Sequence, residues 1–194
     1  MYKQAILAAI AATASAQTAE ERAKYPDWAE KADHWKMEWE SFELEVAGYT
    51  LTLFHTTGFS DLGPIEISKP PLLMVHAMSQ NAEEWIDPAA MLIPNLPLSM
   101  QLAADGYDVW FANLRASKYG AVHDTYTITD AEYWDFTWYD QGVEDQLEMV
   151  KFIYDKTGGR KVSMYGYSQG TSSSLAGISE KPDEYSKYAN VIGL

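Results

Sequence analysis

The segment most informative about the fold is Met164-Tyr165-Gly166-Tyr167-Ser168-Gln169-Gly170. It follows a short apolar run over residues 161–165 and precedes a segment over residues 169–178 that favours a helix. A Gly-x-Ser-x-Gly sequence between a strand and a helix is typical of a sharp turn that carries a nucleophilic serine, because small residues at Gly166 and Gly170 permit the bend. The alternative is an ordinary glycine-rich turn between a strand and a helix.

The turn predicts that its serine acts as a nucleophile. Ser168 Oγ is expected to stand above the sheet, where it can attack a carbonyl carbon. The helix that begins near Gln169 directs its first backbone N–H groups and its positive end toward the same place, which favours a developing oxyanion.

A second chain segment is needed, because an oxyanion hole takes N–H donors from two segments. The run Leu72-Leu73-Met74-Val75-His76-Ala77-Met78 is a candidate. It predicts a buried strand followed by a turn in which the Met78 N–H is one donor and the Gln169 N–H the other. His76 and Ala77 are expected to support this loop. A histidine in the core or in a loop, without such a role, is the alternative for His76.

Outward from these two segments, the sequence alternates strands and helices. Residues 42–46 and 49–54 predict a hairpin with one polar face and a turn at Ala47-Gly48. Apolar strands are predicted over residues 72–76, 107–112 and 161–165, with a further strand from residue 191 to 194. Helices are predicted over residues 97–104 and 169–178, and a further helix from residue 143 is predicted to end at Gly158-Gly159. This order predicts an α/β sheet with right-handed crossovers.

The ordered series of motifs resembles the acid lipases, the group of α/β-hydrolases that includes the gastric and lysosomal enzymes and related steryl ester hydrolases. The resemblance covers about residues 40–194. It rests on these segments: residues 48–53, 71–77, 102–110 with Asn113-Leu114-Arg115, 133–138 with Asp145, 156–158 and 166–171. It implies an α/β-hydrolase fold, a mostly parallel sheet with an N-terminal antiparallel hairpin and flanking helices, cut off after the sixth strand.

The resemblance also implies a function. Ser168 would form an acyl-enzyme with a triacylglycerol or steryl ester at a lipid interface, and no cofactor or metal would be required. Asn113 and Arg115 would have mainly architectural roles, with an exposed charge as the alternative for Arg115. Ala77 and Ala116 stand where the family has glycine, and a methyl group at Ala77 is expected to crowd its loop.

The triad of this fold runs in the order Ser, Asp or Glu, His. All four histidines, His34, His55, His76 and His123, precede Ser168, and Asp183 is the one aspartate that follows it. We therefore expect the reading frame to continue past Leu194 and to encode the missing aspartate and histidine. Residues 1–194 alone are expected to be inactive. The alternatives are a natural short protein and an inactive relative used for binding or assembly; thioesterase or peptidase chemistry also stays open.

Composition limits the other classes of function. The chain has 194 residues, 47% of them hydrophobic, and a formal net charge of −14, so phosphate backbones would repel it and nucleic-acid binding is not expected. It has no cysteine, and therefore no disulfide or thiolate site. The sequence also lacks the His-Glu-x-x-His metal motif and the glycine-rich phosphate and dinucleotide motifs.

The N-terminus predicts the compartment. Lys3 precedes an apolar run over residues 5–12, and the small residues Ala14 and Ala16 follow it, as in a secretory signal peptide. An alanine-rich first helix is the alternative. We expect a signal peptide at 1–16, a polar lead-in at 17–40 and the N-terminal part of the hydrolase domain at 41–194. The product would be secreted or lumenal, as in the lysosome, without a transmembrane segment.

Overall fold

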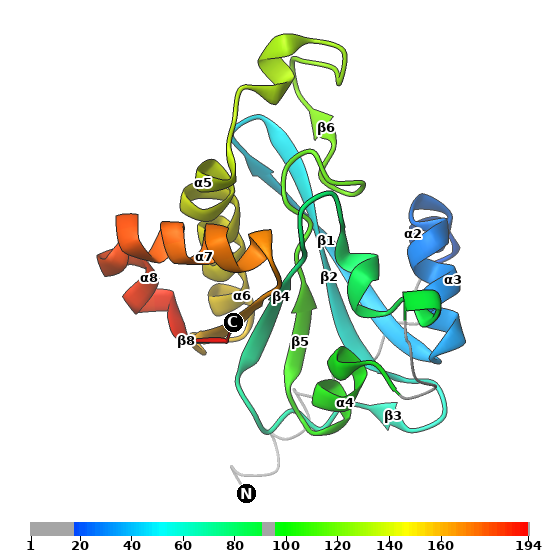
Figure 1. Cartoon of the computed structure of the whole chain (residues 1–194). Helices are drawn as coiled ribbons and strands as arrows, with labels where there is room; N and C mark the ends of the chain where they lie inside the picture. The colour runs from blue at the N-terminus through cyan, green and yellow to red at the C-terminus, as the bar shows by residue number, and fades with distance from the viewer. Residues whose placement is uncertain (1–17, 91–95, 194) are drawn as a thin grey trace, which may run out of the picture.

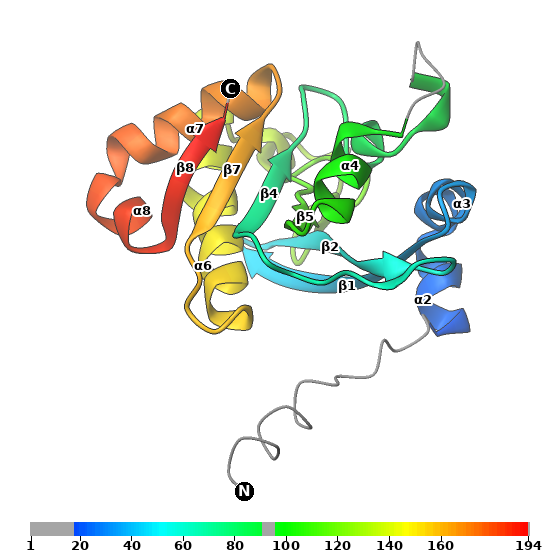
Figure 2. The same cartoon turned by 90° about the horizontal axis from the view of Figure 1, so that it is seen from below.

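The computed structural model describes residues 18–90 and 96–193, and its centre is a twisted sheet with helices on both faces (Figures 1 and 2). The strand order is β1-β2-β5-β4-β7-β8. The strands on this path are β1 (Met37–Val46), β2 (Tyr49–Phe59), β4 (Pro71–Val75), β5 (Asp108–Phe111), β7 (Val162–Gly166) and β8 (Ala189–Gly193). The short strands β3 (Gly63–Pro64) and β6 (Val122–His123) pair with β2.

Strand directions confirm the predicted architecture. β1 and β2 form an antiparallel hairpin, and β2 also pairs antiparallel with β5. β5, β4, β7 and β8 run parallel to one another. The hairpin turns at Ala47 and Gly48, which have φ angles of 50° and 86°, as expected of a tight turn that matches the twist of the two strands. The sheet is therefore mixed but mostly parallel.

The hairpin differs from the prediction in length and in burial. β1 begins at Met37 rather than at residue 42, and β2 continues to Phe59 rather than ending at residue 54. The predicted polar face is largely absent from β2, where even Thr52 and Thr56 are buried. β2 lies between β1 and β5, so neither of its edges is free. Its two faces are covered because its residues belong to the hydrophobic clusters on both sides of the sheet, Leu51 and Leu53 on one side and Phe54 and Phe59 on the other.

Segments predicted as helices are present, with additions. The α-helices are α2 (Ala19–Lys24), α3 (Pro26–His34), α4 (Leu98–Ala104), α5 (Trp138–Asp140), α6 (Leu147–Lys156), α7 (Gln169–Glu180) and α8 (Pro182–Tyr188). Short 3-10 turns are η1 (Ala82–Trp85), η2 (Pro88–Ala90) and η3 (Ala131–Trp134). The helix predicted from residue 143 to Gly158-Gly159 begins instead as a π-helix, η4 (Gln141–Gln146), which leads into α6, and α6 ends at Lys156 close to the predicted glycines.

Two hydrophobic clusters cover the two faces of the sheet. Alternate residues of each strand point to opposite faces, so Leu73 joins one cluster and Met74 the other. On the first face α6 and α8 cover the strands, and on the second face α3 and α4 cover them. Trp28 of α3 is fully buried against Phe54, with ring centroids 4.2 Å apart. The segment over residues 17–40 thus contributes to the core.

The signal peptide predicted over residues 1–16 lies outside the described residues. In the part of the chain that the structure describes, no helix is long and apolar enough to cross a membrane.

Candidate active site

The turn between β7 and α7 has the strained conformation that the sequence predicts. Ser168 has φ 52° and ψ −114°, a region that residues with a Cβ rarely adopt. The residues two positions before and after Ser168 must be glycine for steric reasons. A Cβ at Gly170 would lie 2.4 Å from Val75 O, and a Cβ at Gly166 would lie 2.6 Å from Thr171 N. The two glycines therefore let α7 approach β4 and β7 closely, which leaves Ser168 exposed at the tip of the turn.

A pocket of about 620 Å³ opens beside this turn, at the carboxyl ends of β4 and β5. The sequence-predicted residues His76, Ala77, Met78 and Gln169 all line it. Aromatic side chains of Trp134, Phe136 and Trp138 form an apolar wall. The fold therefore brings the two predicted segments, residues 76–78 and 168–169, to one edge of the sheet.

Two backbone N–H groups in this pocket have no acceptor. Within the described residues, neither the Met78 N–H nor the Gln169 N–H donates a hydrogen bond, and the Ser168 hydroxyl has no partner either. Ala77 differs, because its N–H donates to Glu84 Oε2 at 2.9 Å. The φ of Ala77 is not positive, so its methyl group causes no backbone strain at this position.

His76 holds the loop over residues 76–81, the β4–η1 loop, against the loop that follows β5. Its Nε2 accepts a hydrogen bond from the Leu114 N–H at 3.2 Å, so its Nδ1 carries the proton and donates to Ala77 O at 2.8 Å. Burial lowers the pKa of His76 to about 4 despite the bond to Ala77 O. The ring is neutral at neutral pH, and both of its nitrogens are engaged.

Arg115 is buried, which rules out the exposed charge considered for it and supports the architectural role. Its Nε and Nη2 donate to Asp145 Oδ1 at 2.9 and 2.6 Å, and its backbone N–H donates to Asp145 Oδ2 at 2.9 Å. Burial opposes the charge of Arg115, but the carboxylates of Asp145 and Glu144 outweigh it and raise its pKa. This pair connects the edge of the pocket to η4.

Asn113 also has a structural role. Its amide group donates to Thr52 O at 2.8 Å and accepts from the Ala82 N–H at 2.9 Å.

Some residues at the pocket were not predicted from the sequence. Gln141 Oε1 accepts a hydrogen bond from Gln169 Nε2 at 2.7 Å, which links η4 to the first residue of α7. The π-helix directs Gln141 toward the pocket. The spacing of apolar residues in the sequence does not predict a π-helix at this position. Gly142 could have been noticed, since a Cβ there would lie 1.9 Å from Ser173 O of α7. The described residues include no group of three or more histidine, aspartate or glutamate side chains placed to hold a metal ion.

Comparisons with known proteins agree with this geometry. Residues 70–189, more than half of the chain, match the family model of the alpha/beta hydrolase fold. The chain is 34% identical over 133 residues to triacylglycerol lipase 1 of Arabidopsis thaliana, which covers 69% of this chain and 32% of that protein. It is 29% identical over 155 residues to human lysosomal acid lipase/cholesteryl ester hydrolase, which covers 77% of this chain and 37% of that protein.

A solved structure matches in fold. The naproxen esterase of Bacillus subtilis aligns with a TM-score of 0.54 at 14% identity, over 91% of this chain and 49% of that one. The chain spans about a third of the length of the two lipases. The family match, the sheet order and the strained serine turn lead to one conclusion: this chain belongs to the alpha/beta hydrolase fold family.

Proposed function

We propose that this chain carries the nucleophile and the oxyanion hole of a serine ester hydrolase that acts on neutral lipid esters. One observation carries the proposal. Ser168 stands in a left-handed conformation on a strand-to-helix turn, and the two segments beside it present the unpaired N–H groups of Met78 and Gln169 at one pocket. Hydrolysis of esters through an acyl-enzyme needs this combination.

The reaction follows from these groups. A base removes the proton of Ser168 Oγ as the oxygen attacks the ester carbonyl carbon. The carbonyl oxygen becomes an oxyanion, which accepts hydrogen bonds from the Met78 and Gln169 N–H groups. The tetrahedral intermediate collapses and releases the alcohol, which takes up the proton. Water then attacks the acyl-enzyme by the same route and releases the carboxylic acid, and Ser168 regains its proton.

The base is not among the described histidines. Both nitrogens of His55 face carboxylates, both nitrogens of His76 are engaged, and His123 Nδ1 accepts from the Thr125 and Tyr126 N–H groups. His34 ends α3, which lies far from α7 in both views (Figures 1 and 2). We therefore propose that the histidine and the acid that orients it belong to chain outside residues 1–194.

The substrate class is a proposal of the same kind. The aromatic wall of Trp134, Phe136 and Trp138 favours an apolar acyl or alcohol group. A neutral ester suits a chain with a net charge of −14, which would repel an anionic substrate or surface. The names of the two lipases support triacylglycerols or steryl esters as substrates, and one of them supports a lysosomal location. The apolar run over residues 5–12 behind Lys3 supports a signal peptide at 1–16 and a secreted or lumenal product.

The test is hydrolysis of p-nitrophenyl butyrate by the full-length protein. Ser168→Ala should lower kcat by at least about 10³-fold, because the nucleophile is lost. Ser172→Ala is the matched control, since Ser172 is exposed on the same helix one turn later, and it should leave kcat unchanged. Retained hydrolysis in Ser168→Ala would contradict the proposal. A folded full-length protein without esterase activity would instead favour an inactive relative used for binding.

A further inference from the structure

Two adjacent glutamates on η1, Glu83 and Glu84, contact different parts of the molecule. Glu83 faces α3 and the loop after β5, and Glu84 faces back toward the β4–η1 loop (residues 76–81). Glu84 Oε2 accepts the hydrogen bond of the Ala77 N–H at 2.9 Å, and Glu84 is half-buried. This bond joins the first turn of η1 to the residue that immediately precedes Met78.

The bonds around Ala77 fix the direction of the Met78 N–H. Ala77 O accepts from His76 Nδ1 at 2.8 Å and from the Gln80 N–H at 3.1 Å. Ala77 O and the Met78 N–H belong to one trans peptide unit, so they point in opposite directions. With Glu84 holding the N–H side of Ala77 and His76 holding its carbonyl, the backbone of Ala77 is restrained on both sides. The Met78 N–H is thereby directed away from His76.

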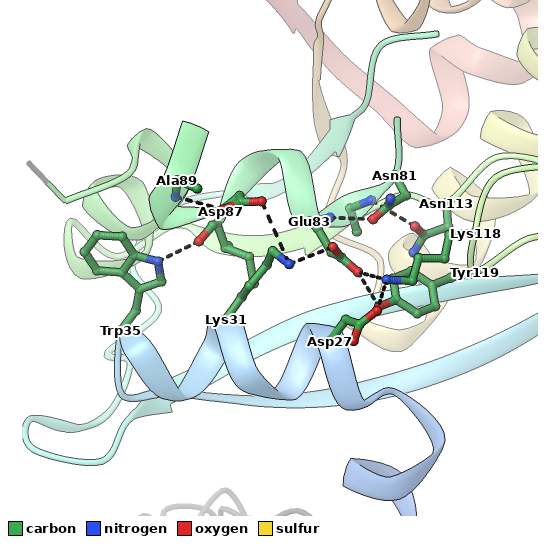
Figure 3. A network of polar contacts seen from close by, with 12 residues as sticks. Asp27, Lys31, Trp35, Asn81, Glu83, Asp87, Ala89, Asn113, Lys118 and Tyr119 are labelled. Carbon is green, nitrogen blue, oxygen red and sulfur yellow. Dashed lines mark hydrogen bonds and ion pairs between the residues drawn. The ribbon is translucent and has the colours of Figure 1, made fainter. Parts of the chain in front are cut away.

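Figure 3 shows the polar contacts of Glu83, the residue that precedes Glu84 on η1. Glu83 accepts from Lys31 at 2.9 Å, from Lys118 at 2.6 Å and from the Tyr119 hydroxyl at 2.5 Å. Lys118 also pairs with Asp27. In addition, the Ala82 N–H donates to Asn113 Oδ1 at 2.9 Å, and the Glu83 N–H donates to Asn81 Oδ1 at 2.9 Å. Because η1 is anchored to α3 and to two loops, the backbone of Glu84 is held within reach of the Ala77 N–H.

We propose that Glu84 is a positioning residue, which holds the oxyanion donor of Met78 in place by accepting the hydrogen bond of the Ala77 N–H. The inference rests on the proposed function, since it gives Glu84 a role in that same oxyanion hole. It also gives α3 a part in the site, because Lys31 pairs directly with Glu83 of η1, and Asp27 pairs with Lys118, which in turn pairs with Glu83.

The experiment compares variants of the full-length protein that differ in the acceptor at position 84. Glu84→Ala removes the acceptor and should lower kcat for p-nitrophenyl butyrate by about 10- to 100-fold with KM within about 3-fold, because an oxyanion donor acts mainly in the transition state. Glu84→Gln keeps an acceptor oxygen at the same reach and should keep kcat within about 3-fold of the parent. Glu66→Ala is the control, since Glu66 is exposed on the segment after β3.

A second measurement separates positioning from general damage. An alkylboronic acid forms a tetrahedral adduct with the serine, so its inhibition constant should rise in Glu84→Ala in proportion to the fall in kcat. If Glu84→Ala does not fold, Glu84→Leu fills the same space without an acceptor and should give the same loss. Unchanged kcat in the folded Ala or Leu variant, or an equal loss in Glu84→Gln, would overturn the inference.

These outcomes are distinguishable from failure of the proposed function. If Ser168→Ala retains activity, the ester hydrolase proposal itself fails. If Ser168→Ala is inactive and Glu84→Ala is as active as the parent, only the role of Glu84 is lost.

Discussion

His55 and His76 are both buried in the sheet region, yet their surroundings favour opposite charge states. His55 lies on β2 with Nδ1 2.8 Å from Glu40 Oε1 and Nε2 2.6 Å from Asp108 Oδ1, and its ring stacks on Trp110 at 3.9 Å. Burial opposes its charge, but the two carboxylates outweigh that effect and raise its pKa. His76, at the pocket, meets only neutral backbone groups, and burial lowers its pKa to about 4.

The charge of the partners, rather than burial alone, therefore sets the protonation state of each histidine. In the hairpin region, an ion-paired His55 joins β1, β2 and β5, since its partners come from the strands on either side. At the pocket, a neutral His76 orients a loop without adding charge beside the oxyanion donors. The ion pairs of His55 stabilise the hairpin region, whereas the pocket contains unpaired N–H donors and a strained serine.

Loss of the ion pair in the hairpin region should lower the free energy of unfolding more than any other change considered below. His55→Ala leaves the Asp108 carboxylate buried without its close partner, because Arg160 Nη1 is 4.0 Å from Asp108 Oδ2. We expect a loss of about 3–5 kcal/mol in the free energy of unfolding. Urea denaturation at pH 6 measures it. His34→Ala, at an exposed position on α3, is the control and should change stability by less than about 0.5 kcal/mol. An equal effect of the two variants would contradict the account of His55.

The next effect is on the pH dependence of stability. His76 has a lower pKa in the folded protein than its ordinary value of 6.5, so the unfolded chain binds the proton first as the pH falls. Its contribution to stability is therefore complete above pH 6.5 and declines by up to about 3 kcal/mol toward pH 4. Denaturation of the parent and of His76→Gln at pH 4, 5, 6 and 7 should give curves that converge in acid.

His55 should behave in the opposite sense. Its pKa is raised in the folded protein, so its contribution is complete below pH 6.5 and is lost as the pH rises through that raised pKa. The stability difference between the parent and His55→Ala should therefore shrink in alkali. Parallel pH curves for the parent and either histidine variant would show that these rings do not titrate as their partners imply.

The smallest expected effect concerns backbone strain at the pocket. Ala116 has φ 60°, a conformation that glycine adopts without the steric cost of a Cβ. The relief of about 1–2 kcal/mol of strain exceeds the about 0.4–1 kcal/mol by which glycine favours the unfolded chain, so Ala116→Gly should raise the free energy of unfolding by up to about 1 kcal/mol. Ala104→Gly is the matched control on helix α4, where the same substitution should lower stability by up to about 1 kcal/mol. Thermal denaturation of both variants decides the point, and destabilisation by Ala116→Gly would refute it.

Much of this arrangement follows from local sequence. The spacing of Gly166, Ser168 and Gly170 predicts the strained turn, and the apolar run over residues 72–75 predicts a central strand, because both signals lie within a few neighbouring residues. The positions of His76, Ala77, Met78 and Gln169 at one edge follow from the parallel order of β4 and β7.

What the sequence did not predict depends on contacts between distant segments. Trp28 is the one large side chain among the buried residues of α3, which otherwise are Ala29 and Ala32, and it is buried because β1, β2 and β5 meet α3 there. The bond from Ala77 to Glu84 and the pair of Lys31 with Glu83 join residues whose proximity no periodicity encodes. The π-helix at Gln141 likewise depends on the close approach of Gly142 to α7.

Covalent labelling determines whether Ser168 is an activated nucleophile. The full-length protein is treated with a fluorophosphonate, digested, and mapped by mass spectrometry, with Ser168→Ala alongside. The account predicts one phosphonyl adduct, on Ser168, which is absent in Ser168→Ala, because an ordinary serine does not react. A folded full-length protein that stays unlabelled at Ser168, or that is labelled equally in Ser168→Ala, would contradict it.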